Sequence, residues 1–258
     1  MKALAEAFVY RAYIAQKKLS IPLDEIRPAT ASPGLAMLRL YADYLANPKN
    51  KLKVVEEVEK RAGGNLESPD PLFFLMAAHV YMAEANFDSA LRMLHQADDL
   101  ECHALAVQCL LKIYRPDLAL KELKKMQEKD EDATITQLAT AWVNMALGKE
   151  KLQEAFYIYQ EMMDKYGETP LLQIAQSATL IQQEKFEEAE KALAEALQRD
   201  ANAPDAIANM ILVQQQLGKP PEQAKRYISQ LREGHPEHPW TRDYAALEAQ
   251  FDRILASA

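Results

Sequence analysis

The residues best suited to chemistry are histidines and cysteines, and their spacing argues against catalysis. Cys102 and His103 are adjacent in a predicted helix, where neighbouring side chains point about 100° apart, so a Cys-His dyad is not expected. His235 and His238 form an H-x-x-H pair between prolines without a third ligand nearby, which favours an exposed turn over a metal site. His79 lies among apolar residues of a helix, as a core or groove histidine does, rather than a catalytic base.

Other chemical signatures are absent from the sequence. It contains no Gly-rich phosphate loop, G-x-S-x-G elbow, H-E-x-x-H or C-x-x-C motif. Acidic residues 130–132 precede a predicted helix, where capping is a better interpretation than a recognition loop. Lys121, Lys124, Lys125 and Lys129 crowd one helix, which favours a solvated face over a site for phosphoinositides or acidic partners. We therefore expect no enzyme activity, cofactor or metal.

Composition favours a helical, soluble chain. Its 258 residues include only 7 glycines, and its net charge of −8 disfavours nucleic acid and anionic membrane surfaces as direct ligands. Cys102 and Cys109 are too far apart along a helix for a disulfide and are predicted to be small buried residues in a reducing compartment. No apolar run approaches the ~18 residues of a membrane helix, and no secretory signal is present. An intracellular protein is expected.

The elements that would position any site repeat along the chain. Residues 185–204 predict an amphipathic helix, and the same pattern occurs 34 residues earlier, where Ala155 replaces Ala189. Ala90 and Ala119 take this place in two earlier units, at spacings of 29 and 36 residues. A small residue here allows two helices to approach closely. Longer glycine-rich or polar connections include residues 63–71, the interior loop that we expect to be most mobile.

This pattern of paired helices resembles the tetratricopeptide repeat. The resemblance implies an all-α, right-handed α-solenoid of about seven helix pairs, covering residues 1–238, with a C-terminal capping helix over 239–258. That last helix is predicted to bury Tyr244, Leu247, Phe251 and Ile254. The first helix, over 3–16, has an edge on which another helix could stack. This edge predicts either a preceding segment of chain or a binding partner, so Met1 is either a natural start or a truncation.

Several first helices carry more apolar residues than one buried face needs. In the repeat that the chain resembles, these helices line a concave groove, and an extended apolar groove marks a partner site. The alternative is that a tightly curled solenoid buries the extra residues against itself. The groove is predicted to consist of Leu75, His79, Met82, Gln108, Leu111, Thr140, Asn144, Leu147, Leu171, Ile174, Ala178, Ile181, Leu212 and Gln215.

A more specific resemblance covers nearly the whole chain. Its segments are similar to those of the epsilon subunit family of coatomer, the COPI coat of Golgi transport vesicles. The segments that carry the resemblance are VYRAYIAQ (9–16), LDEIRP (23–28), ADYLA (42–46), FFLMAA (73–78), ALRMLHQADDLEC (90–102), KELKKMQEKDEDATITQLATAW (121–142), LGKPPEQAKRYISQL (217–231), GHPEHP (234–239) and FDRIL (251–255).

This resemblance implies a scaffold without enzyme activity. Its concave groove would bind the C-terminal domain of the alpha coatomer subunit and, through it, the other coat subunits. The protein would be cytoplasmic, peripheral on Golgi membranes and coated vesicles, and active in Golgi-to-ER retrograde and intra-Golgi transport. Two departures stand out: family members usually have a further N-terminal helical unit, and Ile174 and Ala175 replace their Asn-Gly.

Two other interaction functions remain open at the level of sequence. A chaperone-linked tetratricopeptide adaptor would need Lys and Arg in the groove to hold an acidic C-terminal peptide. The predicted inner helices offer mainly Gln, Thr and Asn, with Lys112 nearly alone. An adaptor of the membrane-fusion machinery would also be a helical-repeat protein, and binding to coat subunits would distinguish it from a coat scaffold.

Overall fold

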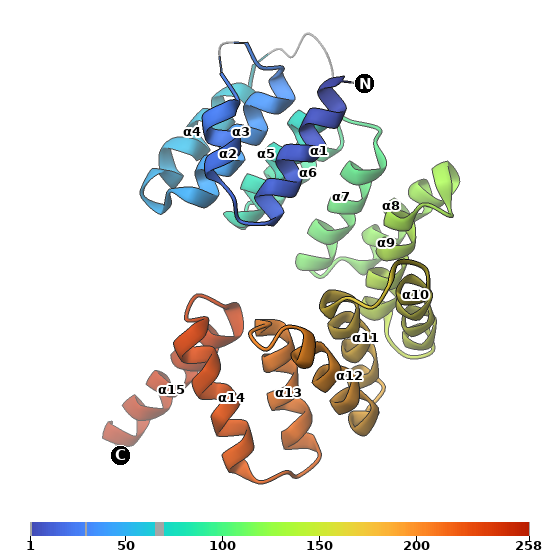
Figure 1. The fold of residues 1–258 in the computed structure, drawn as a ribbon, viewed down its shortest axis with the longest axis vertical. Coiled ribbons are helices and arrows are strands. Elements are labelled where there is room, and N and C mark those ends of the chain that lie inside the picture. Colours follow the sequence, from blue (N-terminus) through green and yellow to red (C-terminus); the bar gives the residue numbers. More distant parts are fainter. Residues whose placement is uncertain (1, 29, 65–69, 258) are drawn as a thin grey trace. The chain divides into compact units, whose positions relative to one another are not determined.

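The computed structural model describes residues 2–28, 30–64 and 70–257, and the regular elements within these ranges are all helical (Figure 1). Within them, seven successive pairs are followed by one long helix. The paired helices are α1 (Lys2–Ala15) and α2 (Ser20–Glu25), α3 (Pro33–Ala46) and α4 (Lys51–Ala62), α5 (Pro71–Ala83) and α6 (Phe87–Leu94), α7 (Leu100–Lys112) and α8 (Pro116–Asp130), α9 (Thr134–Leu147) and α10 (Lys151–Tyr166), α11 (Pro170–Gln182) and α12 (Phe186–Arg199), and α13 (Pro204–Gln216) and α14 (Pro221–Gly234).

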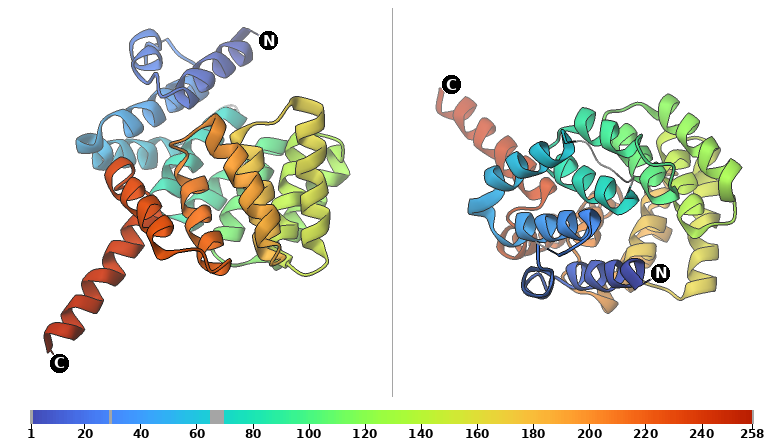
Figure 2. Two further views of the ribbon diagram at one scale, coloured as in Figure 1. Left: turned by 60° about the horizontal axis from the view of Figure 1, so that its bottom comes forward. Right: turned by 90° about the horizontal axis from the view of Figure 1, so that it is seen from above.

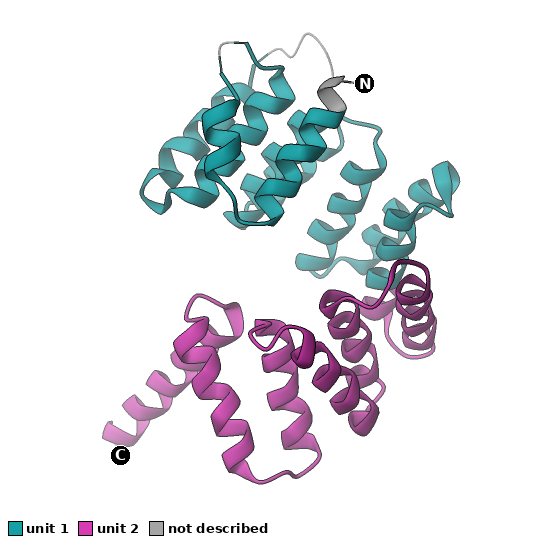
Figure 3. Ribbon diagram, in the orientation of Figure 1, with its two compact units in different colours: residues 1–143 teal, residues 144–258 magenta. Residues whose placement is uncertain are grey.

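The last helix is α15 (Pro239–Ser257), and a short 3₁₀ turn, η1 (Pro48–Asn50), precedes α4. The all-helical, paired organisation predicted from the sequence is thus confirmed in the described residues. Residues 65–69 of the predicted mobile connection lie outside them. The chain divides into two compact units, residues 1–143 and 144–258 (Figure 3). The single domain over 1–238 and the right-handed coiling stay predictions.

Helix starts follow from local chemistry. Thr169 caps α11 by accepting a hydrogen bond from the Leu172 amide at 3.3 Å, and Pro170 supplies a preset backbone angle at the first position. Asp99 caps α7 in the same way, at 2.9 Å from the Glu101 amide. These caps place each helix start within about a residue or two of its predicted position, as is usual for helix boundaries.

The turn inside most pairs requires a left-handed backbone. Lys17, Ala85, Tyr114 and Glu184 adopt φ values of 56–60°, whereas the turn between α13 and α14 uses Gly218 at φ 64°. A side chain in this region is strained, while glycine enters it freely. The turns therefore store strain that the surrounding helix packing must offset.

Replacing Tyr114 with glycine is expected to raise the free energy of unfolding by about 0.5–1 kcal/mol. The tyrosine side chain is 90% exposed, so little packing is lost when it is removed. Urea denaturation followed by circular dichroism measures the change, and Gly218→Ala should lower stability in the matched turn. A less stable Tyr114→Gly chain would show that relief of strain does not govern this turn.

The core of each unit uses the repeated small residues. Ala90 and Ala119 in the second helices of unit 1, and Ala155 and Ala189 in those of unit 2, are fully buried. This confirms their predicted role at close helix contacts. Large buried side chains, among them Leu94 in unit 1 and Leu193 in unit 2, fill the space between the helices.

The prediction that the C-terminal helix buries Leu247, Phe251 and Ile254 is wrong. Leu247, Phe251 and Ile254 are largely exposed, and only Tyr244 is partly covered. Within unit 2, α15 projects beyond α13 and α14 (Figure 2). The contacts that hold α15 come from its first half: Trp240 packs against the cluster around Leu231, and Glu248 pairs with Arg232 of α14.

Candidate partner-binding surface

The two cysteines lack the properties of nucleophiles. Cys102 and Cys109 are both fully buried, as predicted for small core residues. Burial raises the pKa of each thiol to about 12, so neither forms a thiolate near neutral pH. The Cys102 thiol instead donates a weak hydrogen bond to the backbone oxygen of Pro71 at 3.7 Å, across the α5–α7 contact.

Among the histidines considered as candidates for chemistry, His238 makes a structural contact instead. His238 lies 3.1 Å from the Asp205 carboxylate, from Nε2 to Oδ1, and this contact ties the start of α15 to the start of α13. Within residues 2–28, 30–64 and 70–257, no group of three His, Cys, Asp or Glu side chains has the geometry of a metal site. None of the helices in the same ranges is long and apolar enough to cross a bilayer.

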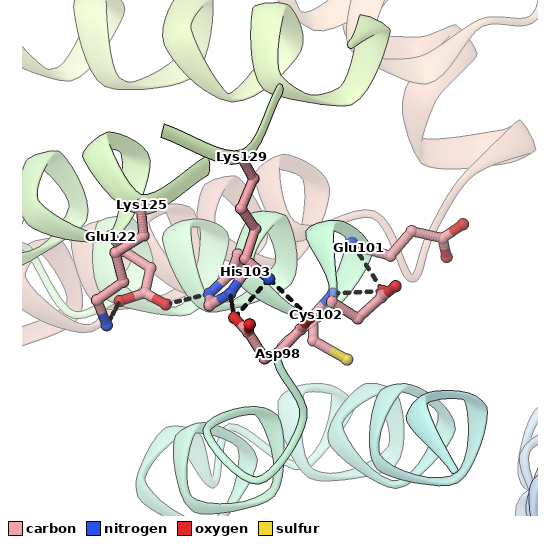
Figure 4. Close-up of polar contacts among 8 residues, drawn as sticks. Asp98, Glu101, Cys102, His103, Glu122, Lys125 and Lys129 are labelled. Atoms are coloured by element: carbon pink, nitrogen blue, oxygen red, sulfur yellow. Dashed lines mark hydrogen bonds and ion pairs between the residues drawn. The ribbon is translucent and has the colours of Figure 1, made fainter. Parts of the chain in front are cut away.

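His103 is the centre of a polar network that joins α7 to α8 (Figure 4). Its Nδ1 lies 2.6 Å from Oε1 of the buried Glu122, and its Nε2 lies 3.0 Å from Oδ1 of Asp98. Lys125 donates to Oε2 of Glu122 at 2.8 Å, and Lys129 pairs with Asp98 at 2.5 Å. Every ionisable side chain in the network therefore contacts at least one other member of it.

The lysine cluster lies on a solvated face, as predicted, since Lys121, Lys124, Lys125 and Lys129 are all exposed. Two of these lysines also pair with carboxylates, Lys125 with Glu122 of α8 and Lys129 with Asp98, which precedes α7. Burial alone would raise the pKa of Glu122, but its hydrogen bonds with Lys125 and His103 hold the pKa below its ordinary value. The network thus has a structural role in the α7–α8 contact. No local pattern in the sequence signals it, because Glu122 lies 19 residues after His103.

In unit 1, the N-terminal helix covers part of the predicted groove. Leu75 is only 5% exposed and belongs to a buried cluster that includes Ala7 and Tyr10 of α1. Arg11 of α1 holds this arrangement by pairing with Glu101 of α7, at 2.6 Å between Nη2 and Oε2. Leu75 is therefore a core residue and not part of an open groove. At this position the structure follows the alternative named above, in which the chain buries its extra apolar residues against itself.

His79 shares this covered environment. Its ring stacks on Tyr41 of α3, with ring centroids 5.4 Å apart. Burial, together with the nearby Arg11 guanidinium, lowers the pKa of His79 to about 4. The imidazole is therefore neutral at physiological pH and suits a core or groove position, as its apolar sequence context predicts.

The remaining predicted groove residues of unit 1 are half-buried. Met82 packs against the cluster that contains Leu75, and Leu111 packs against a second cluster around Leu123. Thr140 donates its hydroxyl hydrogen bond to the backbone oxygen of Thr136 at 2.9 Å, within α9. Gln108 is also half-buried. These residues are therefore only partly accessible to a partner.

In unit 2, the predicted residues divide into internal and open positions. Asn144 is buried and donates to the Glu154 carboxylate at 3.3 Å, so its side chain takes part in the α9–α10 contact. Ile174 and Ile181 are half-buried and pack against the cluster around Leu193. Ala178 is half-buried as well.

The open positions lie on the first helices of three consecutive pairs. Leu171 of α11 is 76% exposed, and Leu147 of α9 and Leu212 of α13 are also exposed. Gln215 is exposed one turn after Leu212. We call these four residues the first-helix surface of unit 2. Exposed leucines on successive elements are suited to burial by another protein.

Known structures establish the fold type. A tetratricopeptide repeat protein from Parabacteroides merdae matches with a TM-score of 0.65, over 94% of this chain and 97% of that protein, at 10% identity. A thermophilic tetratricopeptide repeat protein from Thermus thermophilus matches with a TM-score of 0.60, over 69% of this chain and 97% of that protein, at 17% identity. The fold is accordingly a helical solenoid of the tetratricopeptide kind.

Sequence comparison gives the family. The family model described as the coatomer epsilon subunit matches residues 1–258. Coatomer subunit epsilon of Caenorhabditis elegans is 38% identical, over 98% of this chain and 86% of the relative. Coatomer subunit epsilon-1 of Arabidopsis thaliana is 36% identical, over 98% of this chain and 85% of the relative. These matches confirm the resemblance seen in the segments of the sequence, and the chain belongs to the coatomer epsilon subunit family.

Proposed function

We propose that this coat component is a non-enzymatic scaffold that binds the C-terminal domain of the alpha coatomer subunit. Through that domain it joins the other coat subunits, in the cytoplasm and on Golgi membranes and coated vesicles. It thereby supports Golgi-to-ER retrograde and intra-Golgi transport. The observation that carries the proposal is the first-helix surface of unit 2, where Leu147, Leu171 and Leu212 are exposed on consecutive first helices.

Burial of this surface supplies a driving force for binding. Completely burying one leucine side chain contributes about 1.5–3 kcal/mol, and Leu171 at 76% exposure retains most of that contribution for a partner. The half-buried Ile174 and Ile181 lie on the same helix but already pack internally. We therefore assign the main contacts to Leu171 and Leu212.

The charges of the first helices favour an apolar partner over an acidic peptide. Helices α9, α11 and α13 contain neither lysine nor arginine. An acidic C-terminal peptide would need such cations to pair with its carboxylates. This composition supports a coat scaffold over the chaperone-adaptor alternative.

The expected result of a double substitution tests the proposal. Leu171→Glu with Leu212→Glu should weaken binding of the C-terminal domain of the alpha subunit at least about tenfold, because two carboxylates would lose water in the interface. Isothermal titration calorimetry measures the affinity, and circular dichroism checks that the helices remain folded.

Tyr157→Glu is the matched control, because Tyr157 is an exposed apolar residue on α10, a second helix of the same unit. Its affinity should stay close to that of the unmodified chain. A doubly substituted chain that folds and binds as tightly as the unmodified one would contradict the assignment of this surface.

A further inference from the structure

The second half of α15 is an amphipathic helix whose residues are exposed on every face. Each residue from 245 to 256 is exposed. Leu247, Phe251 and Leu255 are 64%, 61% and 59% exposed, although each has a large apolar side chain. An isolated helix of this length is only marginally stable in water. Its exposed apolar residues bury nothing that would stabilise it, so the stability of the helix does not explain them.

The base of the helix is held firmly by its neighbours in unit 2. Trp240 packs against a buried cluster that includes Leu231 and stacks on Tyr244, with ring centroids 5.0 Å apart. The Arg232 guanidinium of α14 lies 5.3 Å from the centre of the Tyr244 ring and also pairs with Glu248. These contacts fix the direction in which the exposed half projects (Figure 2).

The apolar positions follow the spacing of a coiled-coil seam. Trp240, Tyr244, Leu247, Phe251 and Ile254 are separated by alternating steps of four and three residues. This is the a/d pattern by which one helix packs along another, and it differs from the broader stripe of a helix that covers a globular core. The stripe that begins at the partly buried Trp240 thus continues into solvent as a seam for a second helix.

Charge selects the occupant of this seam. Asp243 and Glu248 occupy the g and e positions that flank it, whereas Arg242 and Arg253 lie on the opposite face. In a parallel second copy, Asp243 would face a Glu248 that already pairs with Arg232 of its own chain, so the second copy would offer Asp243 no unpaired cation. A partner helix would present a lysine or arginine to Asp243 in the same way that Arg232 pairs with Glu248.

We propose that residues 244–255 bind an amphipathic helix of another protein whose apolar seam is flanked by lysine or arginine. The site is separate from the first-helix surface of unit 2. It adds a second attachment point, at the end of the chain, to the scaffold function.

The test uses two synthetic helices as probes. Each is about three heptads long with leucine at a and d, and one carries lysine and the other glutamate at e and g. In fluorescence anisotropy with the full chain, the lysine helix should bind at least about tenfold more tightly than the glutamate helix.

Substitutions separate seam packing from general attraction to an acidic protein. Leu247→Glu with Phe251→Glu adds negative charge and removes the apolar seam. If binding were non-specific charge attraction, this double substitution would strengthen binding of the lysine helix. If the seam is the site, the substitution should abolish binding. Arg253→Glu on the opposite face is the control and should retain it. Asp243→Lys should reduce the preference for the lysine helix.

Four results would overturn the proposal. In the probe experiment, these are equal binding of both helices, or binding of the lysine helix that survives Leu247→Glu with Phe251→Glu. The other two are a dimer of the chain that is lost on this double substitution, and sedimentation with phosphatidylserine vesicles that requires Leu247 and Phe251. The last two would assign the stripe to a second copy or to a lipid surface.

Discussion

Replacing Glu122 with alanine is expected to lower the free energy of unfolding by about 3 kcal/mol, because it leaves a buried histidine without its closest partner. Glu122 is buried and lies 2.6 Å from His103, which it shares with Asp98 on the other side of the ring. Urea denaturation followed by circular dichroism measures the loss. Lys124→Ala, at an exposed position of the same helix, should change stability by less than about 0.5 kcal/mol.

The pH dependence of this effect has a defined sign. The folded-state pKa of Glu122 is below its ordinary value, so its ionised form stabilises the fold at higher pH, and this contribution is lost as pH falls through the folded pKa. The stability difference between the unmodified chain and Glu122→Gln should therefore shrink below about pH 4.3. A difference that stays constant down to about pH 3 would contradict the ionised network.

Replacing Gly34 with alanine is expected to lower stability by about 2–3 kcal/mol, through a clash and a lost hydrogen bond. An added Cβ would lie 2.3 Å from Oδ2 of Asp70 and 2.9 Å from Cβ of Leu72. Asp70 cannot simply turn away, because Oδ2 accepts the Gly34 amide at 2.8 Å and Oδ1 caps α5 through the Leu72 amide at 3.1 Å.

The matched control for Gly34 is Gly234→Ala, because an added Cβ at Gly234 has no heavy atom within 4 Å. That substitution should leave the thermal midpoint unchanged or slightly higher. The Gly34→Ala chain should melt at a lower temperature than both the Gly234→Ala chain and the unmodified chain. Equal midpoints for the three chains would show that α3 and α5 have room to separate at this contact.

Local pattern is sufficient to predict the helices and their pairing. The alanines at 90, 119, 155 and 189 are fully buried, as their recurrence indicates, because a close helix contact depends on residues that are near one another in sequence. Capping residues such as Thr169 also act locally, and this is why the helix starts can be predicted to within about a residue or two.

Contacts between distant elements cannot be predicted in this way. An apolar stripe has the same periodicity whether it is covered or exposed. The pattern predicts Leu75 in a groove, but α1 covers it, and it predicts Phe251 in the core, but that side chain faces solvent. The positions of Asn144 and His103 depend on carboxylates of the following helices, for which periodicity provides no signal.

Co-expression with the C-terminal domain of the alpha coatomer subunit, followed by size-exclusion chromatography, is the decisive test of the proposed scaffold function. We expect the two proteins to elute together, and we expect Leu171→Glu with Leu212→Glu to separate them while Tyr157→Glu does not. Separate elution of the unmodified chain and the alpha-subunit domain, with both proteins folded, would show that the chain does not bind this domain.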